Sequence, residues 1–280
     1  MTPLRQKMIE DMQLAGLSAG TQKVYVDCVA ALAKHYMRSP ELLTEQELRD
    51  YFLYLEKGKG LSDSTRKQHL YANKFLFTKT LDRDWPVLKF ARVKVHKTQR
   101  GILSIDEVSE ILQSIIEPTS QMCVALMYTC GLRVSEVTHL RMEHIDSRRK
   151  VLYVCGKGGK DRYVPLPERV LDKLRKYWLI SRPAVWLFPS PKKQDTPINP
   201  RVIRRWLKEA LEHTSIRKKV TCHTFRHSYA TQMLDEGLDI RIVKSLLGHA
   251  SLRSTMVYVH MSDASRQEVH TVVNRVTDAL

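Results

Sequence analysis

The sequence has few of the features that mark secreted, membrane-spanning or zinc-binding proteins. Its 280 residues include only five cysteines, and no two of them form a CxxC pair. An odd, scattered set of this kind indicates neither a disulfide framework nor a zinc ribbon, so we interpret the cysteines as reduced structural thiols. No apolar run approaches the ~18 residues that would span a bilayer. The first residues lead into a charged helix rather than a signal peptide, and we expect a globular, cytoplasmic protein.

Acidic residues are scarce relative to basic ones. The chain has 30 aspartates and glutamates against 46 lysines and arginines, a net charge of +16, and its pI is near 9.7. The excess is spread along the chain, with about +7 in residues 1–100 and about +9 in residues 101–280. Such surfaces favour a polyanionic partner, and both halves should touch nucleic acid. A basic membrane-surface protein is the alternative, but no basic amphipathic tail or lipidation signal is present.

Residues 1–84 predict a small helical bundle. Apolar residues recur at helical spacing, and capping signals precede each run. The expected helix starts lie near Pro3, at Ser18 or Thr21, at Thr44 in a capping box with Glu47, and at Ser62 or Ser64. Lysines on the fourth helix are either a solvated face or contacts to a DNA backbone.

The composition changes in residues 85–102. This tract is basic, carries no helical stripe and ends near Gly101. We interpret it as an extended linker between two domains. A positively charged linker between two basic domains would let them close around a duplex.

Residues 103–280 predict a second, mixed domain. Ser104 and Glu107 form another capping box, and Gly131 interrupts a later helix just before Arg133 and Glu136. A helix N-terminus favours an anion, and a guanidinium there adds two fork-like donors. The alternative role of Arg133 is an ion pair with Glu136.

Residues 150–166 alternate like strands around a glycine-rich turn and predict a β-hairpin. Its tip carries Lys157 and Lys160, beside glycines that allow the backbone to approach a ligand. The segment is not a Walker A motif, because the GxxxxGK[ST] spacing is missing. A solvated turn is the ordinary role of such lysines.

Residues 222–260 are rich in histidine, arginine and tyrosine, within a segment whose apolar residues recur at helical spacing. Phe225, Tyr229, Met233 and Leu234 recur at spacings of three and four and predict a buried face. His223 and Arg226 lie three apart and therefore share one side of a turn, where a phosphate would suit both. His227 makes a zinc-like pair with His223, but the metalloprotease glutamate is missing. The two helices around Gly237 are also compatible with a DNA-reading helix-turn-helix.

These motifs resemble, in order, those of the tyrosine recombinases, the phage integrase and Xer-type family. The matching elements are Arg133 in a GLRxSE context, Lys157 in a GKGxK hairpin, His223-x-x-Arg226, Leu-Gly-His249, and Tyr258 nine residues later. The resemblance covers both halves of the chain. It implies a mainly α fold with a small antiparallel β-sheet: a helical, SAM-like core-binding domain at 1–84, a linker at 85–102, and a mixed α/β catalytic domain at 103–280 with a C-terminal tail helix.

The resemblance also implies roles for these residues. Tyr258 would attack a DNA phosphodiester to form a 3′-phosphotyrosyl link, and no cofactor or metal would be needed. Arg133, Arg226 and His249 would stabilise charge on the phosphate oxygens. His223 is similar to the residue that assists proton removal, and Lys157 to the general acid, with Lys160 ranked second. Glu136 is expected to orient Arg133.

We therefore expect a site-specific recombinase acting on double-stranded DNA, associated with the nucleoid, and a homotetramer at synapsis. Off DNA it would be a monomer or dimer. The alternatives are a non-catalytic DNA-binding accessory protein and a type IB topoisomerase. The tail, residues 262–280, carries a valine face that would cover its own domain or dock on a neighbouring subunit. The target sequence and the biological task, whether integration, excision, resolution or transposition, do not follow from these residues.

Overall fold

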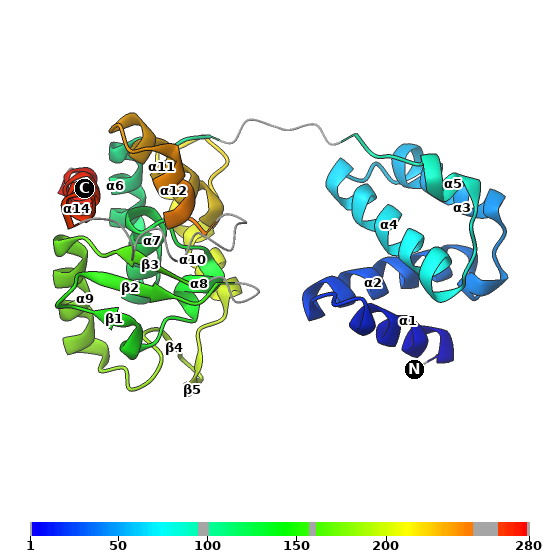
Figure 1. Cartoon of the computed structure of the whole chain (residues 1–280), viewed down its shortest axis with the longest axis horizontal. Coiled ribbons are helices and arrows are strands. Elements are labelled where there is room, and N and C mark those ends of the chain that lie inside the picture. Colours follow the sequence, from blue (N-terminus) through cyan, green and yellow to red (C-terminus); the bar gives the residue numbers. More distant parts are fainter. Residues whose placement is uncertain (1, 95–100, 157–160, 249–262, 279–280) are drawn as a thin grey trace. The chain divides into compact units, whose positions relative to one another are not determined.

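The computed structural model describes residues 2–94, 101–156, 161–248 and 263–278, and it divides into two compact units, Met1–Thr98 and Gln99–Leu280 (Figure 1). Each unit has its own apolar core, so each is described by itself. No helix within the described ranges combines the length and apolar character needed to cross a bilayer.

The regular elements in the described part of the first unit are all helical. Its elements are α1 (Pro3–Leu14), α2 (Ala19–Tyr36), α3 (Glu45–Leu53), α4 (Asp63–Phe75) and α5 (Pro86–Phe90), with a 3₁₀ turn at Pro40–Leu42 and π turns at Tyr54–Gly58 and Leu76–Thr80. The predicted caps are confirmed. Ser18 and Ser62 accept from backbone N–H groups three residues on, and Thr44 and Glu47 form a complete capping box. Met8, Leu32, Leu48, Tyr51 and Phe77 are among the core residues that these helices bury.

One segment predicted to be an extended linker is partly helical. Pro86 occupies the first position of α5, where its missing N–H costs nothing. Val87 and Leu88 are buried in the core of the first unit, and the Val87 N–H donates to the Glu45 carboxylate at 2.7 Å. Packing of two apolar side chains therefore makes a helix where the local sequence has no helical stripe. Residues 95–100 lie outside the described part.

The second unit combines helices with short antiparallel strands. Its described elements are α6 (Ile105–Ser114), α7 (Pro118–Thr129), α8 (Val134–Thr138), a 3₁₀ turn at Met142–His144, β1 (Ile145–Asp146), β2 (Val151–Val154), β3 (Arg162–Pro165), α9 (Glu168–Ser181), β4 (Pro189–Ser190), β5 (Lys193–Pro197), α10 (Pro200–Leu211), α11 (Cys222–Asp235), α12 (Ile240–Leu246) and α14 (Asp263–Asp278). The expected mainly helical fold with a small antiparallel sheet is confirmed.

The predicted hairpin supplies β2 and β3 of a three-stranded sheet in the order β1-β2-β3, so β2 is the central strand. Val151 pairs with Pro165 and Val154 with Arg162. Helix α7 is buried along most of its length, and α9, α10 and α11 all pack against it (Figure 1). The sheet and this helix therefore fix the places of α8 and α11, which carry the candidate site.

The C-terminal helices bury most of their predicted apolar faces. Phe225, Tyr229 and Met233 of α11 are buried, whereas Leu234 is 40% exposed. Leu234 was therefore wrongly assigned to the buried face. The tail helix α14 packs its valines on its own unit, against α9 and α11, with Val269, Val272, Val273 and Val276 buried. The structure thus shows the tail covering its own domain, one of the two arrangements expected.

Candidate active site

Arg133 occupies the N-cap position of α8, directly after a break in the chain's helical path. Gly131 has a φ of +62°, which glycine adopts without strain, and it turns the chain from α7 into α8. The Arg133 N–H donates to Glu136 Oε2 at 2.8 Å, and its Nη1 donates to Oε1 at 2.6 Å. About a third of the Arg133 side chain is exposed. Arg133 thus makes the ion pair with Glu136 and still has part of its side chain exposed to solvent.

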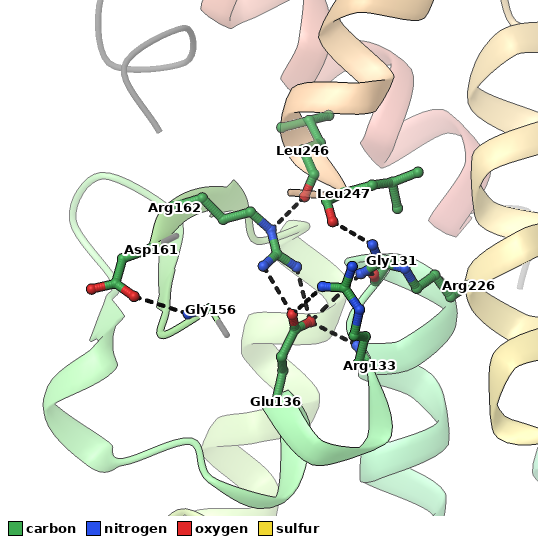
Figure 2. Close-up of polar contacts among 9 residues, drawn as sticks. All are labelled: Gly131, Arg133, Glu136, Gly156, Asp161, Arg162, Arg226, Leu246 and Leu247. Carbon is green, nitrogen blue, oxygen red and sulfur yellow. Dashed lines mark hydrogen bonds and ion pairs between the residues drawn. The ribbon is translucent and has the colours of Figure 1, made fainter. Parts of the chain in front are cut away.

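Glu136 is a buried carboxylate surrounded by three arginines (Figure 2). Besides Arg133, it accepts from Arg162 Nη1 and Nη2 at 3.1 and 2.9 Å, and Arg226 Nη1 lies 3.5 Å from its Oε2. Burial alone would raise the pKa of Glu136, but the hydrogen bonds and charges of Arg162 and Arg133 lower it to about 2. The carboxylate is therefore ionised at neutral pH.

Arg226 lies near the start of α11 and is 6% exposed. Its Nη1 donates to the Gly131 carbonyl at 2.7 Å, and its Nη2 donates to the Leu247 carbonyl (Figure 2). Burial, and next the charge of Arg133, lower the pKa of Arg226 to about 9, with Glu136 acting in the opposite direction. The guanidinium stays charged at neutral pH, but the nearby Glu136 carboxylate only partly offsets its burial and the repulsion from Arg133. A second anion near Arg226 would therefore be stabilised.

Arg162 is a further member of this cluster, and none of the sequence motifs predicted it. It is the first residue of β3 and only 1% exposed, and its Nε donates to the Leu246 carbonyl at 2.6 Å. Alternation along a strand puts Arg162 on the same face as Val164, which is fully buried. That pattern was available in the sequence. A charged residue at an inward position of a hairpin indicates a buried ion pair, because burial of an unpaired charge is too costly.

The base of the hairpin loop is closed by Asp161. Its Oδ1 accepts from the Gly156 N–H at 2.9 Å (Figure 2). Its Oδ2 accepts from the Tyr153 hydroxyl at 2.7 Å. Asp161 thus links the start of β3 to the end of β2 at the base of the loop. Lys157 and Lys160, the two candidate acids, belong to residues 157–160 and lie outside the described part.

His223 lies on the exposed side of the first turn of α11, three residues before the buried Arg226. The two residues are three apart in one helix, as expected, but His223 is exposed and Arg226 is buried. His249 and Tyr258 fall in residues 249–262, outside the described residues. Gly248 precedes this segment directly after α12.

The described cluster carries more positive than negative charge. Three guanidiniums face one carboxylate, which leaves an excess of two positive charges where backbone carbonyls already hold two of the arginines. Planar guanidinium forks match the oxygens of a phosphate. No group of three or more His, Cys, Asp and Glu side chains in the described ranges is arranged to hold a metal ion.

Comparison with known proteins gives consistent matches over both units. Residues 102–265 match the model described as the phage integrase family, and residues 4–87 match that of a phage integrase N-terminal SAM-like domain. A putative integrase/recombinase of Sinorhizobium fredii is 38% identical over 94% of this chain and 85% of its own. The tyrosine recombinase XerA of Pyrococcus furiosus is 34% identical over 92% of this chain and 91% of its own.

Solved structures show the same fold. A lambda integrase dimer bound to a core site has a TM-score of 0.72 at 19% identity, covering 93% of this chain and 98% of the other. A lambda integrase tetramer bound to a Holliday junction has a TM-score of 0.73 at 18% identity, covering 89% of this chain and 76% of the other.

Proposed function

Because the chain belongs to the phage integrase family, and is a site-specific DNA recombinase of the tyrosine type, we propose that Tyr258 cuts and rejoins DNA strands beside the arginine cluster around Glu136. One observation carries the site assignment. Arg133 and Arg226, which are 93 positions apart in the sequence, meet at one buried carboxylate and keep excess positive charge there. A phosphodiester bound at that point would be held by preorganised donors.

The proposed reaction conserves the bond energy of the DNA strand. The Tyr258 oxygen attacks phosphorus, the bond to the 5′-oxygen breaks, and a 3′-phosphotyrosyl link forms. His223 assists removal of the tyrosine proton, and Lys157 gives a proton to the leaving 5′-oxygen. Attack by a 5′-hydroxyl on the phosphotyrosine then reverses the step and rejoins a strand.

Arg133 and Arg226 would act by charge. The phosphorane-like transition state carries more negative charge on its non-bridging oxygens than the ground state does, and fixed guanidiniums favour it. His249 is proposed as a third donor. Lys157, His249 and Tyr258 lie outside the described residues, so the motif match and the family support their proposed roles.

Double-stranded DNA is the proposed partner, and a homotetramer is the proposed form at synapsis. The basic charge of both units supports DNA binding, and a structural relative is a tetramer bound to a Holliday junction. A non-catalytic accessory protein and a type IB topoisomerase are not favoured, because the matched relatives are named integrases and recombinases.

The test uses covalent trapping. Footprinting on the genomic flanks of the gene first locates the binding site, and a duplex nicked next to that site is then incubated with the protein. We expect a denaturation-resistant DNA–protein adduct with the wild type and none with Tyr258→Phe, which keeps the ring but lacks the nucleophile. Normal binding with no adduct in the wild type would instead support an accessory protein.

A further inference from the structure

Arg162 joins three segments of the second unit through one guanidinium. Its Nη1 and Nη2 donate to the two carboxylate oxygens of Glu136 in α8, while its Nε donates to the Leu246 carbonyl at the end of α12 (Figure 2). The side chain itself starts from β3, the second strand of the hairpin. A single planar group therefore fixes α8, α12 and β3 to one another at this point.

The fit between Arg162 and the end of α12 leaves no spare room. Gly248 has a φ of +62°, and a Cβ added there would lie 3.1 Å from Arg162 Nη1 and 3.2 Å from its Cδ. Contacts this short are tighter than ordinary packing, so a side chain at position 248 would push the arginine away. The chain is thus set against Arg162 at the last described residue before His249 and Tyr258.

A purely supporting role does not account for an arginine here. Buried ion pairs are often no more stabilising than apolar side chains of the same volume, because desolvation offsets the attraction. What an arginine adds is direction, since its rigid fork fixes both oxygens of a carboxylate at once. Glu136, so held, receives Arg133 on Oε1 and stands beside Arg226 on Oε2.

We propose that Arg162 is a positioning residue for strand cleavage. It orients the Glu136 carboxylate, which in turn places Arg133 and Arg226, and it anchors the end of α12 from which the chain runs on to the nucleophile. This inference rests on the proposed function. Arg162 is too deeply buried to reach the DNA itself, so it acts only through the residues it holds.

The test separates DNA binding from cleavage. Arg162→Lys keeps the charge but cannot hold Glu136 by a fork and the Leu246 carbonyl at the same time, and Arg162→Met removes the charge. Arg175→Met is the matched control, because Arg175 is exposed and pairs with Asp172 on its own helix, α9. Each full-length variant is titrated with the nicked duplex, and adduct formation is then followed at saturating protein.

We expect both Arg162 variants to bind the duplex within about threefold of the wild type and to form adduct at least about 30-fold more slowly. Displacement of catalytic groups by about 1 Å is enough to cost on the order of a hundredfold. Arg175→Met should match the wild type in both measurements. If Arg162→Met fails to fold, Arg162→Lys decides the question.

Two results would overturn the proposal. Cleavage by Arg162→Lys at the wild-type rate would show that the fork is not needed, and an equal loss of binding and cleavage, as follows from poor folding, would reduce Arg162 to structural support. A wild type that forms no adduct would contradict the recombination mechanism itself. A wild type that cleaves beside an equally active Arg162→Lys would contradict only the role of Arg162.

Discussion

At the scale of single residues, Glu136 is the most constrained group of the site. Its pKa is about 2, below its ordinary value, so the folded protein binds this proton less readily than the unfolded chain does. The resulting stability is fully present above about pH 5 and is lost as the pH falls toward 2. A shift of this size corresponds to on the order of 3 kcal/mol.

The low pKa of Glu136 predicts that the stability difference between the wild type and Glu136→Gln depends on pH. Glu136→Gln should lower the free energy of unfolding at pH 7, and the deficit relative to the wild type should shrink between pH 5 and pH 3, measured by urea unfolding. Glu143→Gln is the control, because Glu143 is exposed and its pair with Arg141 contributes little. A deficit for Glu136→Gln that stays constant over this range would show that the carboxylate charge does not stabilise the fold.

Gly131 gives a second prediction at this scale. Its positive φ is unfavourable for any side chain, and a Cβ there would lie 2.6 Å from the Tyr229 ring. Gly237 has a φ of +87° but nothing within 4 Å, so it isolates the backbone cost. Gly237→Ala should destabilise by about 1 kcal/mol. Gly131→Ala should cost about 2 kcal/mol more, from overpacking.

Thermal unfolding of both glycine variants measures this difference. Gly131 also supplies the carbonyl that holds Arg226, so Gly131→Ala should slow adduct formation as well, whereas Gly237→Ala should not. Equal losses of stability in the two variants would mean that the Tyr229 ring moves aside freely.

At the scale of elements, helix ends were predictable because capping is local. Thr44, Ser62 and Ser104 cap helices where the sequence placed them, since each needs only a hydroxyl and a neighbouring N–H. Strand β5 was not predicted, because its sequence is polar and mostly exposed and has no apolar alternation, although its pairing with β4 is local, with Ser190 opposite Lys193. Helix α5 was missed for a different reason, since Val87 and Leu88 are held by a core built largely from distant residues.

The candidate site was predictable to a similar degree. Arg133, Glu136 and Arg226 are marked by local motifs, and the structure brings them together. Arg162 is marked only by its inward position on β3, and its partners are 26 and 84 residues away. No local motif marks an ion pair between residues so far apart. The only indication in the sequence is a charged residue at a strand position that faces the core.

The loop between β2 and β3 contains two lysines, Lys157 and Lys160, and a further prediction tests which of them is the general acid. Asp161 ties the base of the loop to Gly156 and Tyr153, so the loop that bears the lysines starts from a fixed base. A general acid speeds loss of an alkoxide by about 10² to 10⁴-fold, but a thiolate leaves readily without a proton. A nicked substrate with sulfur in place of the 5′-bridging oxygen therefore removes the need for the acid.

Lys157→Ala should form adduct at least about a hundredfold more slowly than the wild type on the normal substrate, and at nearly the wild-type rate on the sulfur substrate. Lys160→Ala is the matched control and should cleave both substrates almost normally. Rescue of Lys160→Ala by sulfur, with Lys157→Ala unaffected throughout, would reverse the two assignments.

At the scale of the whole molecule, the positive charge is shared by both units, whereas each unit has its own apolar core. The basic excess is shared almost evenly by residues 1–100 and 101–280, whereas the apolar cores are separate, with Phe77 and Leu88 in one and Leu126 and Phe225 in another. Each unit should therefore fold by itself, while full affinity for DNA should require both. Phosphate contacts release counterions, so the number of contacts appears as the slope of binding affinity against salt.

A protein consisting of residues 101–280 tests both statements. Its core does not draw on the first unit, so we expect cooperative thermal unfolding of the isolated piece. Its affinity for the footprinted duplex should fall by at least about tenfold, and log affinity against log salt should have a shallower slope, by nearly one unit for each phosphate that the shorter protein leaves unbound. At saturating concentration it should still form the Tyr258 adduct, because every proposed catalytic group lies in this half. An unchanged slope would mean that the basic residues within 1–100 do not contact DNA phosphates, and their charge would then serve only solubility.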